Sequence, residues 1–235
     1  MHAETRLKTK GLGITVIIPA LNEEKNIANV IRVLQLIGFS NILVIDGNST
    51  DRTREIAAAL GVRVANQNGR GKGDALRHAF GLEGVGDRVV MIDADGSMDP
   101  SEIILLLNEL DNGADIVKGS RFLPRGFSED MTLFRRLGNK VFVALVNLIW
   151  SANYTDLCYG FAAFKKNALD EIYPHLKSKN FEIEAELFII AKKLGLKVKE
   201  VPSYEKERKY GKSNLNGFRD GLQILKTILQ EAFRS

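Results

Sequence analysis

The first half of the chain alternates short runs of branched apolar residues with segments whose apolar residues recur at helical spacing. The apolar runs predict strands at residues 14–18, 41–46, 62–65, 88–93 and 115–118. The segments between them, in which apolar side chains recur every three or four residues, predict helices at 22–37, 51–60, 74–82 and 100–110. This alternation predicts an α/β fold with a mostly parallel central sheet flanked by helices.

The second half of the chain follows a different pattern. We expect a loop, a long and very apolar helix, an apolar run, a second helix, a strand and a closing helix at residues 119–131, 132–150, 160–164, 181–194, 197–201 and from 215 onward. No stretch with the composition of a linker separates the two halves. We therefore expect a single domain over residues 1–235.

Composition narrows the class of protein. Hydrophobic residues make up 45% of the 235 residues, which is typical of a globular protein with a core. The single cysteine, Cys158, excludes an internal disulfide framework and fits a reducing compartment such as the cytoplasm. The best candidate for a membrane span, residues 141–150, is shorter than the roughly 20 residues that cross a bilayer. We therefore expect a soluble protein, or at most one attached to a membrane surface.

Two aspartates one residue apart, Asp93 and Asp95, stand at the end of the strand predicted at 88–93. Paired carboxylates at the tip of a buried strand suit Mg²⁺ or Mn²⁺, which takes the rest of its ligands from water and a substrate phosphate. Turn formation and helix capping are the alternative explanations. Because ligands bind at the carboxyl ends of parallel strands, Asp46 at the end of the strand 41–46 is expected at the same edge of the sheet.

Three further segments carry polar side chains near this edge. Residues 19–24 follow the first strand, and Asn22 is placed to cap the helix after it. The glycine-rich segment 68–74 carries two cations but lacks the spacing of a dinucleotide fingerprint. Residues 192–212 hold eight basic residues of a chain whose net charge is +4, which fits a phosphate, nucleic-acid or anionic-lipid partner. Taken alone, each segment is also explained by turn chemistry or by a solvated loop.

The order of these segments resembles that of glycosyltransferase family 2 over residues 14–215, and most resembles the polyprenyl-phosphate (dolichyl-phosphate) sugar synthases within it. The matching segments are Pro19-Ala20-Leu21-Asn22-Glu23, Asp46, Gly71-Lys72-Gly73-Asp74-Ala75, Asp93-Ala94-Asp95, Gly119-Ser120-Arg121 and Arg208-x-x-Gly211-x-Ser213. The resemblance implies a GT-A-type nucleotide-diphospho-sugar transferase fold, in which residues 14–118 bind the nucleotide sugar and residues 119–235 form the acceptor side. It implies a hexosyltransferase that moves glucose or mannose from a UDP- or GDP-sugar to polyprenyl phosphate with inversion.

The resemblance also assigns roles to residues by their positions. Asp93 and Asp95 would hold Mg²⁺ or Mn²⁺ as the cofactor. Asp95, Arg121 and Arg208 would be the catalytic residues. Arg121, Arg135 and Asn139 would bind the acceptor phosphate. The nucleotide-binding residues would be Pro19, Ala20, Asn22, Glu23, Asp46, Lys72, Gly73, Asp93, Ala94, Asp95, Arg208 and Lys212.

Two departures from the family pattern limit what it implies. Ser97 stands where the closest lipid-linked mannose synthases have a glutamine that helps to hold the metal, so neither a third metal ligand nor a GDP-mannose donor follows. The chain ends at Ser235 without the transmembrane helices of many relatives, so we expect peripheral contact at the cytoplasmic face of a membrane. The helix at 132–150 fits such an interface, and also a buried core helix. We expect no nucleic-acid partner.

The chemistry of the acceptor decides which residues are needed. A phosphate has a second pKa of about 6 and is mostly ionised near neutral pH, so it needs orientation by Arg121 and Arg135 rather than a base. A hydroxyl acceptor needs a base, for which the candidates are Asp156, Glu182 and Glu184. At most one of the two glutamates faces the site, because residues two apart on a helix do not share a face. Three functions stay open: transfer to polyprenyl phosphate, transfer to a soluble or saccharide hydroxyl, and non-catalytic sugar-nucleotide binding by a scaffold.

Overall fold

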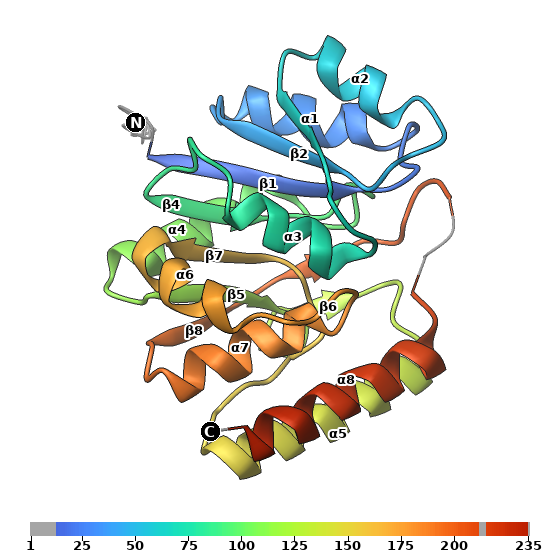
Figure 1. The fold of residues 1–235 in the computed structure, drawn as a ribbon. Coiled ribbons are helices and arrows are strands. Elements are labelled where there is room, and N and C mark those ends of the chain that lie inside the picture. The colour runs from blue at the N-terminus through green and yellow to red at the C-terminus, as the bar shows by residue number, and fades with distance from the viewer. Residues whose placement is uncertain (1–12, 212–214, 235) are drawn as a thin grey trace.

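A computed structural model of the chain describes residues 13–211 and 215–234, and a seven-stranded sheet lies at its centre (Figure 1). The order across the sheet is β3-β2-β1-β4-β7-β5-β8, and β7 runs antiparallel to β4 and β5 while the other neighbours pair in parallel. The strands are β1 (Ile14–Ala20), β2 (Ile42–Asp46), β3 (Arg63–Asn66), β4 (Arg88–Met91), β5 (Ile116–Ser120), β7 (Ala162–Lys165) and β8 (Val198–Pro202). The α/β fold with a mostly parallel sheet that the sequence predicts is confirmed.

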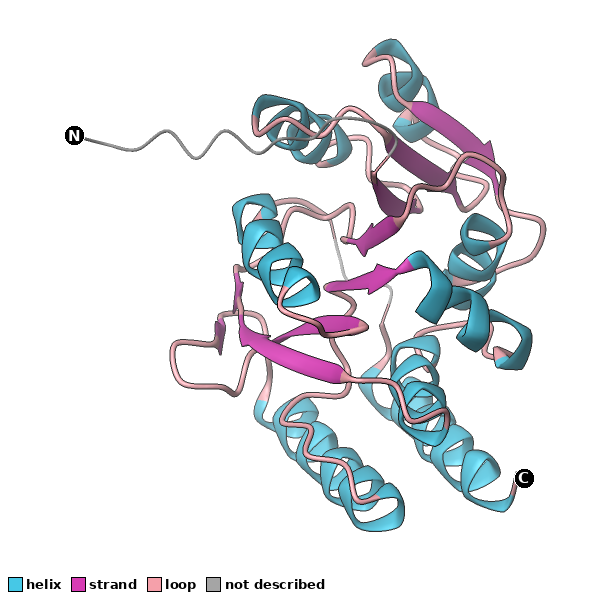
Figure 2. Ribbon diagram, turned by 90° about the vertical axis from the view of Figure 1, so that its left-hand side faces the viewer, coloured by secondary structure: helices cyan, strands magenta, loops and turns pink. Residues whose placement is uncertain are grey.

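Helices cover both faces of this sheet, as the view in Figure 2 shows. The helices of one face are α1 (Ile27–Leu36), α2 (Thr53–Ala59) and α4 (Ile103–Asp111), which follows the short η1 (Pro100–Glu102). Those of the other face are α3 (Lys72–Phe80), α6 (Lys166–Ile172), followed by η2 (Tyr173–His175), and α7 (Ile183–Lys193). Because strand side chains alternate between faces, Val16 and Ile18 of β1 pack in the first layer and Ile17 in the second.

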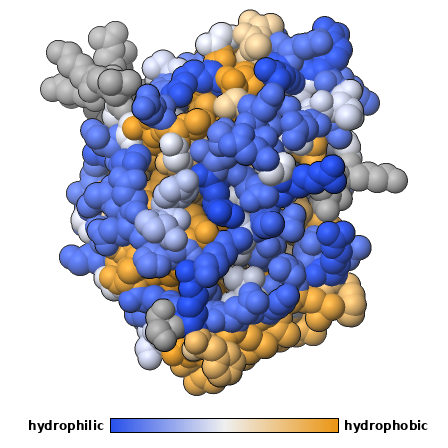
Figure 3. All heavy atoms as spheres, in the orientation of Figure 1, coloured by the Kyte–Doolittle hydropathy of each residue, from blue (hydrophilic) through white to orange (hydrophobic). Residues whose placement is uncertain are grey.

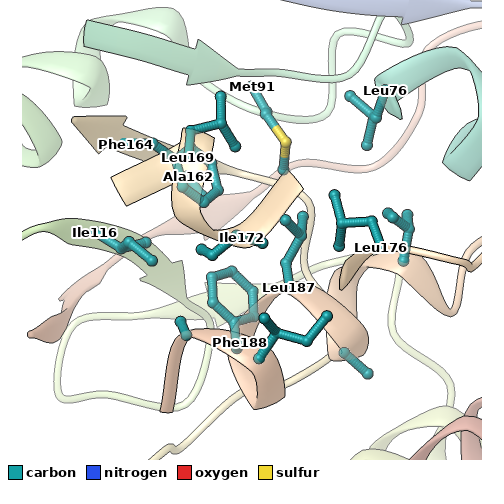
Figure 4. Close-up of a cluster of buried hydrophobic side chains, with 14 of the residues drawn as sticks. Leu76, Met91, Ile116, Ala162, Phe164, Leu169, Ile172, Leu176, Leu187 and Phe188 are labelled. Carbon is teal, nitrogen blue, oxygen red and sulfur yellow. The ribbon is translucent and has the colours of Figure 1, made fainter. Parts of the chain in front are cut away.

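Figure 4 shows the apolar core of the second layer. Met91 and Phe164 from the sheet pack in one cluster with Leu76 from α3 and with Leu187 and Phe188 from α7. Each of these side chains is at most 1% exposed, and burying a side chain of this size contributes roughly 1.5–3 kcal/mol. This packing fixes α3 and α7 against the sheet, so that the polar side chains at the start of each helix meet at the sheet's edge.

Two long helices, α5 (Leu133–Trp150) and α8 (Gly217–Phe233), pack against each other beside α7 (Figure 1). Only Asn139 and Val146 of α5 are buried. The alternative prediction, a buried core helix at residues 132–150, is therefore wrong. Both helices expose large apolar side chains, namely Leu133, Phe134, Leu137, Val141, Leu148, Ile149, Phe218, Leu222, Leu229 and Phe233. Among the described residues, no helix combines the length and the apolar composition needed to cross a bilayer.

A small second sheet joins two loops that the sequence shows as plain loops. In it, β6 (Phe127–Ser128) pairs in parallel with β9 (Tyr204–Glu205). Glu205 strengthens the junction, because it accepts hydrogen bonds from Ser128 Oγ and, at 3.1 Å, from Arg121 Nη1. Strands of two residues have no hydrophobic period, so the sequence carries no signal for them.

The first helix begins later than the sequence predicts. α1 starts at Ile27, and Asn22 has a φ of 56°, in the left-handed region that does not start a right-handed helix. Asn22 Oδ1 accepts a hydrogen bond from the Thr50 amide at 2.8 Å, and the Asn22 amide donates to Ser49 Oγ at 2.9 Å. The predicted helix cap at Asn22 is therefore wrong, and this residue instead joins the loops that follow β1 and β2.

Candidate active site

A cavity of about 350 Å³ opens at the carboxyl ends of β1 and β4, the edge of the sheet where ligands bind in such folds. It is lined by the loops that follow these strands, by the start of α3, α5 and α7, and by the segment between β9 and α8. The predicted site residues that line it are Pro19, Ala20, Glu23, Lys72, Asp93, Ala94, Asp95, Arg121, Arg135 and Arg208. Asn22, Asp46, Gly73 and Asn139 do not line it, and Lys212 lies outside the described residues.

The two aspartates of the Asp-Ala-Asp segment face this cavity and are held by different cations. Asp95 Oδ2 lies 2.7 Å from Arg208 Nη2, and Asp95 Oδ1 accepts a hydrogen bond from the Ser97 amide at 2.9 Å. Asp93 Oδ1 lies 2.6 Å from Lys72 Nζ. Two carboxylates that open onto one cavity and attract cations fit a divalent metal ion.

Few protein groups are available to complete the coordination of such an ion. Within residues 13–211 and 215–234, no three His, Cys, Asp or Glu side chains are arranged to hold a metal. Ser97 is buried and lines the cavity, but its carbonyl oxygen already accepts a hydrogen bond from the Lys206 amide at 2.8 Å. An ion held by Asp93 and Asp95 would therefore take its remaining ligands from water and from phosphate oxygens, as Mg²⁺ commonly does.

The basic segment after β9 reaches across the cavity. Arg208 Nη1 lies 2.7 Å from Glu23 Oε1, while its Nη2 binds Asp95, so one guanidinium joins the loops that follow β1 and β4. Asn26 Nδ2 donates to the Tyr210 carbonyl at 3.1 Å and fixes the same segment. Burial raises the pKa of Glu23, although the Asn26 amide and the Arg208 guanidinium oppose this shift. A segment that spans a cavity and carries cations is suited to cover a bound diphosphate.

Lys72 lies between two carboxylates on the floor of the cavity. Its Nζ is 2.6 Å from Asp93 Oδ1 and 2.7 Å from Glu184 Oε1. Gly160 makes room for this cluster, because a Cβ there would lie 2.6 Å from Lys72 Nζ and 2.8 Å from Glu184 Oε1. Burial raises the pKa of the Glu184 carboxyl, which the Lys72 ammonium lowers in turn. Glu182 does not line the cavity, so only Glu184 of this pair faces it, as their helical spacing predicts.

The guanidinium of Arg121 is bound to carboxylates of the protein. Its Nε donates to Asp156 Oδ2 at 2.7 Å, its Nη2 to Asp156 Oδ1 at 3.0 Å and its Nη1 to Glu205 Oε2 at 3.1 Å. The group also lies 4.5 Å from the centre of the Tyr159 ring. Burial alone would raise the pKa of Asp156, but the Arg121 charge outweighs it and holds this pKa below its usual value. Arg121 therefore has protein partners where the resemblance implies an acceptor phosphate.

The predicted residues that do not line the cavity have other contacts. Asn139 is buried in α5, and its Oδ1 accepts hydrogen bonds from the Leu157 and Cys158 amides at 3.0 and 3.2 Å. It thereby holds the segment that carries Asp156. Asp46 Oδ2 accepts from the Ser49 amide at 3.1 Å, and its buried Oδ1 has no partner among the described residues. Gly73 allows α3 to pack closely against the segment around Ser178, because a Cβ at position 73 would lie 2.5 Å from the Ser178 carbonyl oxygen.

The cavity also contains residues that the sequence did not single out. Asp130 lies before α5, and its Oδ2 accepts a hydrogen bond from Arg135 Nη1 at 3.2 Å. Asn216, Arg219 and Asp220 come from the start of α8. In the sequence these residues are recognisable only as the beginning of an amphipathic helix. The sequence pattern does not show that this helix, α8, starts beside the cavity.

The chain matches a known family over most of its length. The family model described as Glycosyl transferase family 2 matches residues 15–173. The glycosyltransferase AglJ of Haloferax volcanii is 35% identical over 220 residues, which cover 93% of this chain and 72% of that protein. The UDP-N-acetylglucosamine–dolichyl-phosphate N-acetylglucosaminyltransferase of Methanococcus voltae is 32% identical over 213 residues, which cover 80% of this chain and 84% of that protein.

A solved structure has a similar fold. Glucosyl-3-phosphoglycerate synthase from Mycobacterium tuberculosis, in complex with Mn²⁺, uridine diphosphate and glucosyl-3-phosphoglycerate, superimposes with a TM-score of 0.75. The match covers 94% of this chain and 80% of that one, at 25% sequence identity. The GT-A-type glycosyltransferase fold that the sequence resemblance implies is thus confirmed.

Proposed function

The chain belongs to glycosyl transferase family 2, and from this premise we propose that it transfers a sugar from a UDP-sugar to polyprenyl phosphate, with inversion and with a divalent metal ion. The observation that carries the proposal is one continuous cavity. It is lined by Asp95 and Arg208, which suit a diphosphate and its metal. It is also lined by Arg135, at the start of a helix that exposes apolar side chains. A donor diphosphate and a lipid phosphate would thus meet in one space.

The donor side of the proposal rests on the carboxylates and the basic segment. Asp93 and Asp95 would hold Mg²⁺ or Mn²⁺, which when bound neutralises charge on the leaving diphosphate. Arg208, with Lys212, would cover that diphosphate and stabilise the same charge. The uridine base is proposed because the Methanococcus voltae relative is named for a UDP-sugar and the Mycobacterium tuberculosis structure contains uridine diphosphate.

The nucleotide would lie along the loops that follow β1 and β2. Pro19, Ala20 and Glu23 line the cavity there. Asn22 does not line it, but joins the two loops by accepting a hydrogen bond from the Thr50 amide. Asp46 itself is buried and does not line the cavity, but Gly47, which follows it, does. In this arrangement residues 14–118 supply most of the donor site, and Arg208 from the second half closes it.

The acceptor side rests on the exposed face of α5 and α8. Figure 3 shows apolar surface along the edge of the molecule where these helices lie in Figure 1. Leu133 and Leu148 are 85% and 81% exposed on α5, and Phe233 is 88% exposed on α8. A contiguous apolar face on paired helices fits the boundary between lipid head groups and acyl chains. The protein would bind there peripherally, at the cytoplasmic face of the membrane that holds its lipid acceptor.

The carboxylates of the cavity favour a phosphate acceptor over a hydroxyl. A hydroxyl needs a base, but of the three candidates Asp156 and Glu182 do not line the cavity, and Glu184 is bound to Lys72. A phosphate oxygen is already a nucleophile near neutral pH, since its second pKa is about 6. It would attack the anomeric carbon of the sugar from the face opposite the leaving diphosphate, which inverts the configuration.

The decisive experiment is a transfer assay with radiolabelled UDP-glucose, UDP-N-acetylglucosamine and GDP-mannose. Each donor is incubated with polyprenyl phosphate, with the matching polyprenol, with a soluble saccharide or with no acceptor, in the presence of Mn²⁺ or of a chelator. We expect metal-dependent label in the organic phase only with a UDP-sugar and polyprenyl phosphate. Label transferred only to soluble acceptors would establish the hydroxyl alternative. The absence of metal-dependent turnover with every donor would support a non-catalytic sugar-nucleotide-binding protein.

A further inference from the structure

Two helices begin beside the cavity and place an arginine at the same position of their first turns. The Thr132 Oγ1 caps α5 by accepting a hydrogen bond from the Arg135 amide at 3.3 Å. The Asn216 Oδ1 caps α8 by accepting one from the Arg219 amide at 3.0 Å. Each arginine is therefore the third residue after its cap, and both arginines line the cavity.

The starts of the two helices are in close contact. A Cβ built at Gly217, the first residue of α8, would lie 3.5 Å from the Phe134 ring and 3.8 Å from Arg135 Cγ. Arg135 and Arg219, which both line the cavity, thus belong to two helix starts that contact each other. The free amide groups of two helix N-termini add to the positive potential of the two guanidinium groups.

The arginines that line the cavity differ in whether carboxylates of the protein already bind them. The guanidinium of Arg121 is bound by Asp156 and Glu205, and that of Arg208 by Glu23 and Asp95. The guanidinium of Arg219 has no hydrogen bond or ion pair among the residues 13–211 and 215–234. Among the described arginines that line the cavity, it is the one for which no described carboxylate has to be displaced by an anion.

The acidic groups beside Arg135 and Arg219 already have partners within the protein. Asp130 binds Arg135 Nη1 at 3.2 Å, in a pair whose side chains are 30% and 40% exposed and therefore only weakly held. Asp220 Oδ2 accepts a hydrogen bond from the Asn216 amide at 2.7 Å, which occupies it in the cap of α8. A phosphate with two negative charges could replace Asp130 on Arg135 while it also binds Arg219.

We propose that Arg219 is a ligand of the acceptor phosphate, which it shares with Arg135. This inference rests on the proposed function, and it specifies a phosphomonoester attached to a hydrocarbon chain. The hydrocarbon follows from what adjoins the two arginines, because Phe134 and Phe218 are 60% and 68% exposed beside them. Two guanidinium groups suit a phosphate because each can donate two parallel hydrogen bonds to its oxygens.

The test compares Arg219→Gln with Arg136→Gln. Arg136 is exposed on α5, its guanidinium lies 5.8 Å from the centre of the Phe122 ring, and it does not line the cavity. Rates are measured with a saturating UDP-sugar and increasing citronellyl phosphate, a water-soluble polyprenyl phosphate that requires no membrane, and then with a fixed citronellyl phosphate concentration and increasing UDP-sugar. We expect Arg219→Gln to raise the acceptor KM at least about tenfold, the loss of one charge-assisted contact, with an unchanged donor KM. Arg136→Gln should leave both values within about twofold. An unchanged acceptor KM in Arg219→Gln would overturn the inference, as would an equal rise in the donor KM.

A binding measurement separates this inference from the proposed function. Citronellyl phosphate and citronellol are titrated by calorimetry into wild-type protein and Arg219→Gln, each loaded with Mn²⁺ and uridine diphosphate. If wild-type protein transfers no sugar to any lipid phosphate, the proposed function fails, and binding still decides the role of Arg219. Binding of the phosphate by wild-type protein and its loss in Arg219→Gln supports the inference. Equal binding by both proteins, equal binding of citronellol, or no binding by wild-type protein rejects it.

Discussion

The guanidinium of Arg208 lies 2.7 Å from Asp95 Oδ2, the carboxylate oxygen that the proposed metal ion would need. A side-chain cation and a divalent ion would therefore compete for one oxygen. A donor diphosphate removes this conflict, because it offers oxygens to both. Arg208 then has two states, one on Asp95 and Glu23 and one on the diphosphate.

We predict that Arg208→Gln tightens Mn²⁺ binding in the absence of nucleotide. Removing one positive charge within contact of Asp95 leaves the site more negative, which favours the ion by about 1 kcal/mol or more, roughly fivefold in affinity. The same change weakens binding of uridine diphosphate and slows turnover. Electron paramagnetic resonance of free Mn²⁺ gives the affinity directly.

Lys209→Gln is the control, since this neighbour has its ammonium 5.5 Å from the centre of the Tyr210 ring and forms no ion pair among the described residues. It should bind Mn²⁺ as the wild-type protein does. Weaker or unchanged Mn²⁺ binding by Arg208→Gln would show that the guanidinium does not compete with the ion.

We predict that Asp95→Asn loses Mn²⁺ binding and at least about 100-fold of turnover, because an amide oxygen carries no net charge for the ion. Asp99→Asn is the matched control in the same segment. Asp99 accepts hydrogen bonds from the Ser101 amide and from Lys206 Nζ, and an asparagine keeps an acceptor for the amide. Turnover of Asp99→Asn should stay within a few-fold of wild type. Equal losses in both variants would indicate a general disturbance of the segment.

Parts of this site could be predicted because their signals are local. The apolar strands and the Asp-Ala-Asp segment each lie within a few consecutive residues, so pattern and chemistry can be read together. The partners of Arg121 could not, because Asp156 and Glu205 lie 35 and 84 residues further along the chain. Which carboxylate a buried arginine meets depends on the packing of β5, β9 and the segment before β7. Arg219 was missed for the same reason, since only the contact between α5 and α8 brings it to the cavity.

We predict that Arg121→Ala lowers the free energy of unfolding by about 3–5 kcal/mol, because it leaves the buried Asp156 without its counter-charge. Arg135→Ala should cost at most about 1 kcal/mol, since its pair with Asp130 is partly exposed. Urea denaturation of both variants gives these differences. If Arg121→Ala unfolds like wild type and only raises the acceptor KM, Arg121 is an acceptor ligand after all.

The stability deficit of Arg121→Ala should shrink as the pH falls. In wild type the pKa of Asp156 lies below its usual value of 3.8, so the ionised carboxylate stabilises the fold at all pH values above that range. Without Arg121, the largest opposing charge is lost and the weaker effect of Lys118 remains, so burial raises this pKa above the unfolded value. The variant then gains stability relative to wild type as the pH falls from 7 toward 4, because its buried carboxyl takes up a proton. Urea midpoints at several pH values test the sign, and a deficit that stays constant or grows contradicts it.

We predict that the rate of Glu184→Gln with polyprenyl phosphate still falls at low pH as the wild-type rate does, so that the acid limb of the pH–rate profile is kept. That limb would come from the acceptor phosphate, whose second pKa is about 6. If the acceptor were a hydroxyl and Glu184 its base, turnover would need this carboxyl ionised and would fall as the pH drops through its raised pKa. The variant would then lose both the turnover and the limb. Rates between pH 5 and 8 separate the two acceptor classes.

We predict that replacing Leu133, Leu148 and Phe233 together by glutamine abolishes binding to lipid vesicles without changing transfer to citronellyl phosphate. These side chains are 81–88% exposed, so their removal costs the fold little, while each contributes apolar area to a membrane contact at about 25 cal/mol per Å². Flotation with vesicles that contain polyprenyl phosphate measures the binding. Leu36→Gln is the control, because this leucine is 84% exposed but lies on α1. Retained flotation of the triple variant would show that the face of α5 and α8 is not the membrane contact, and a parallel loss of transfer to the soluble acceptor would place the defect in the cavity instead.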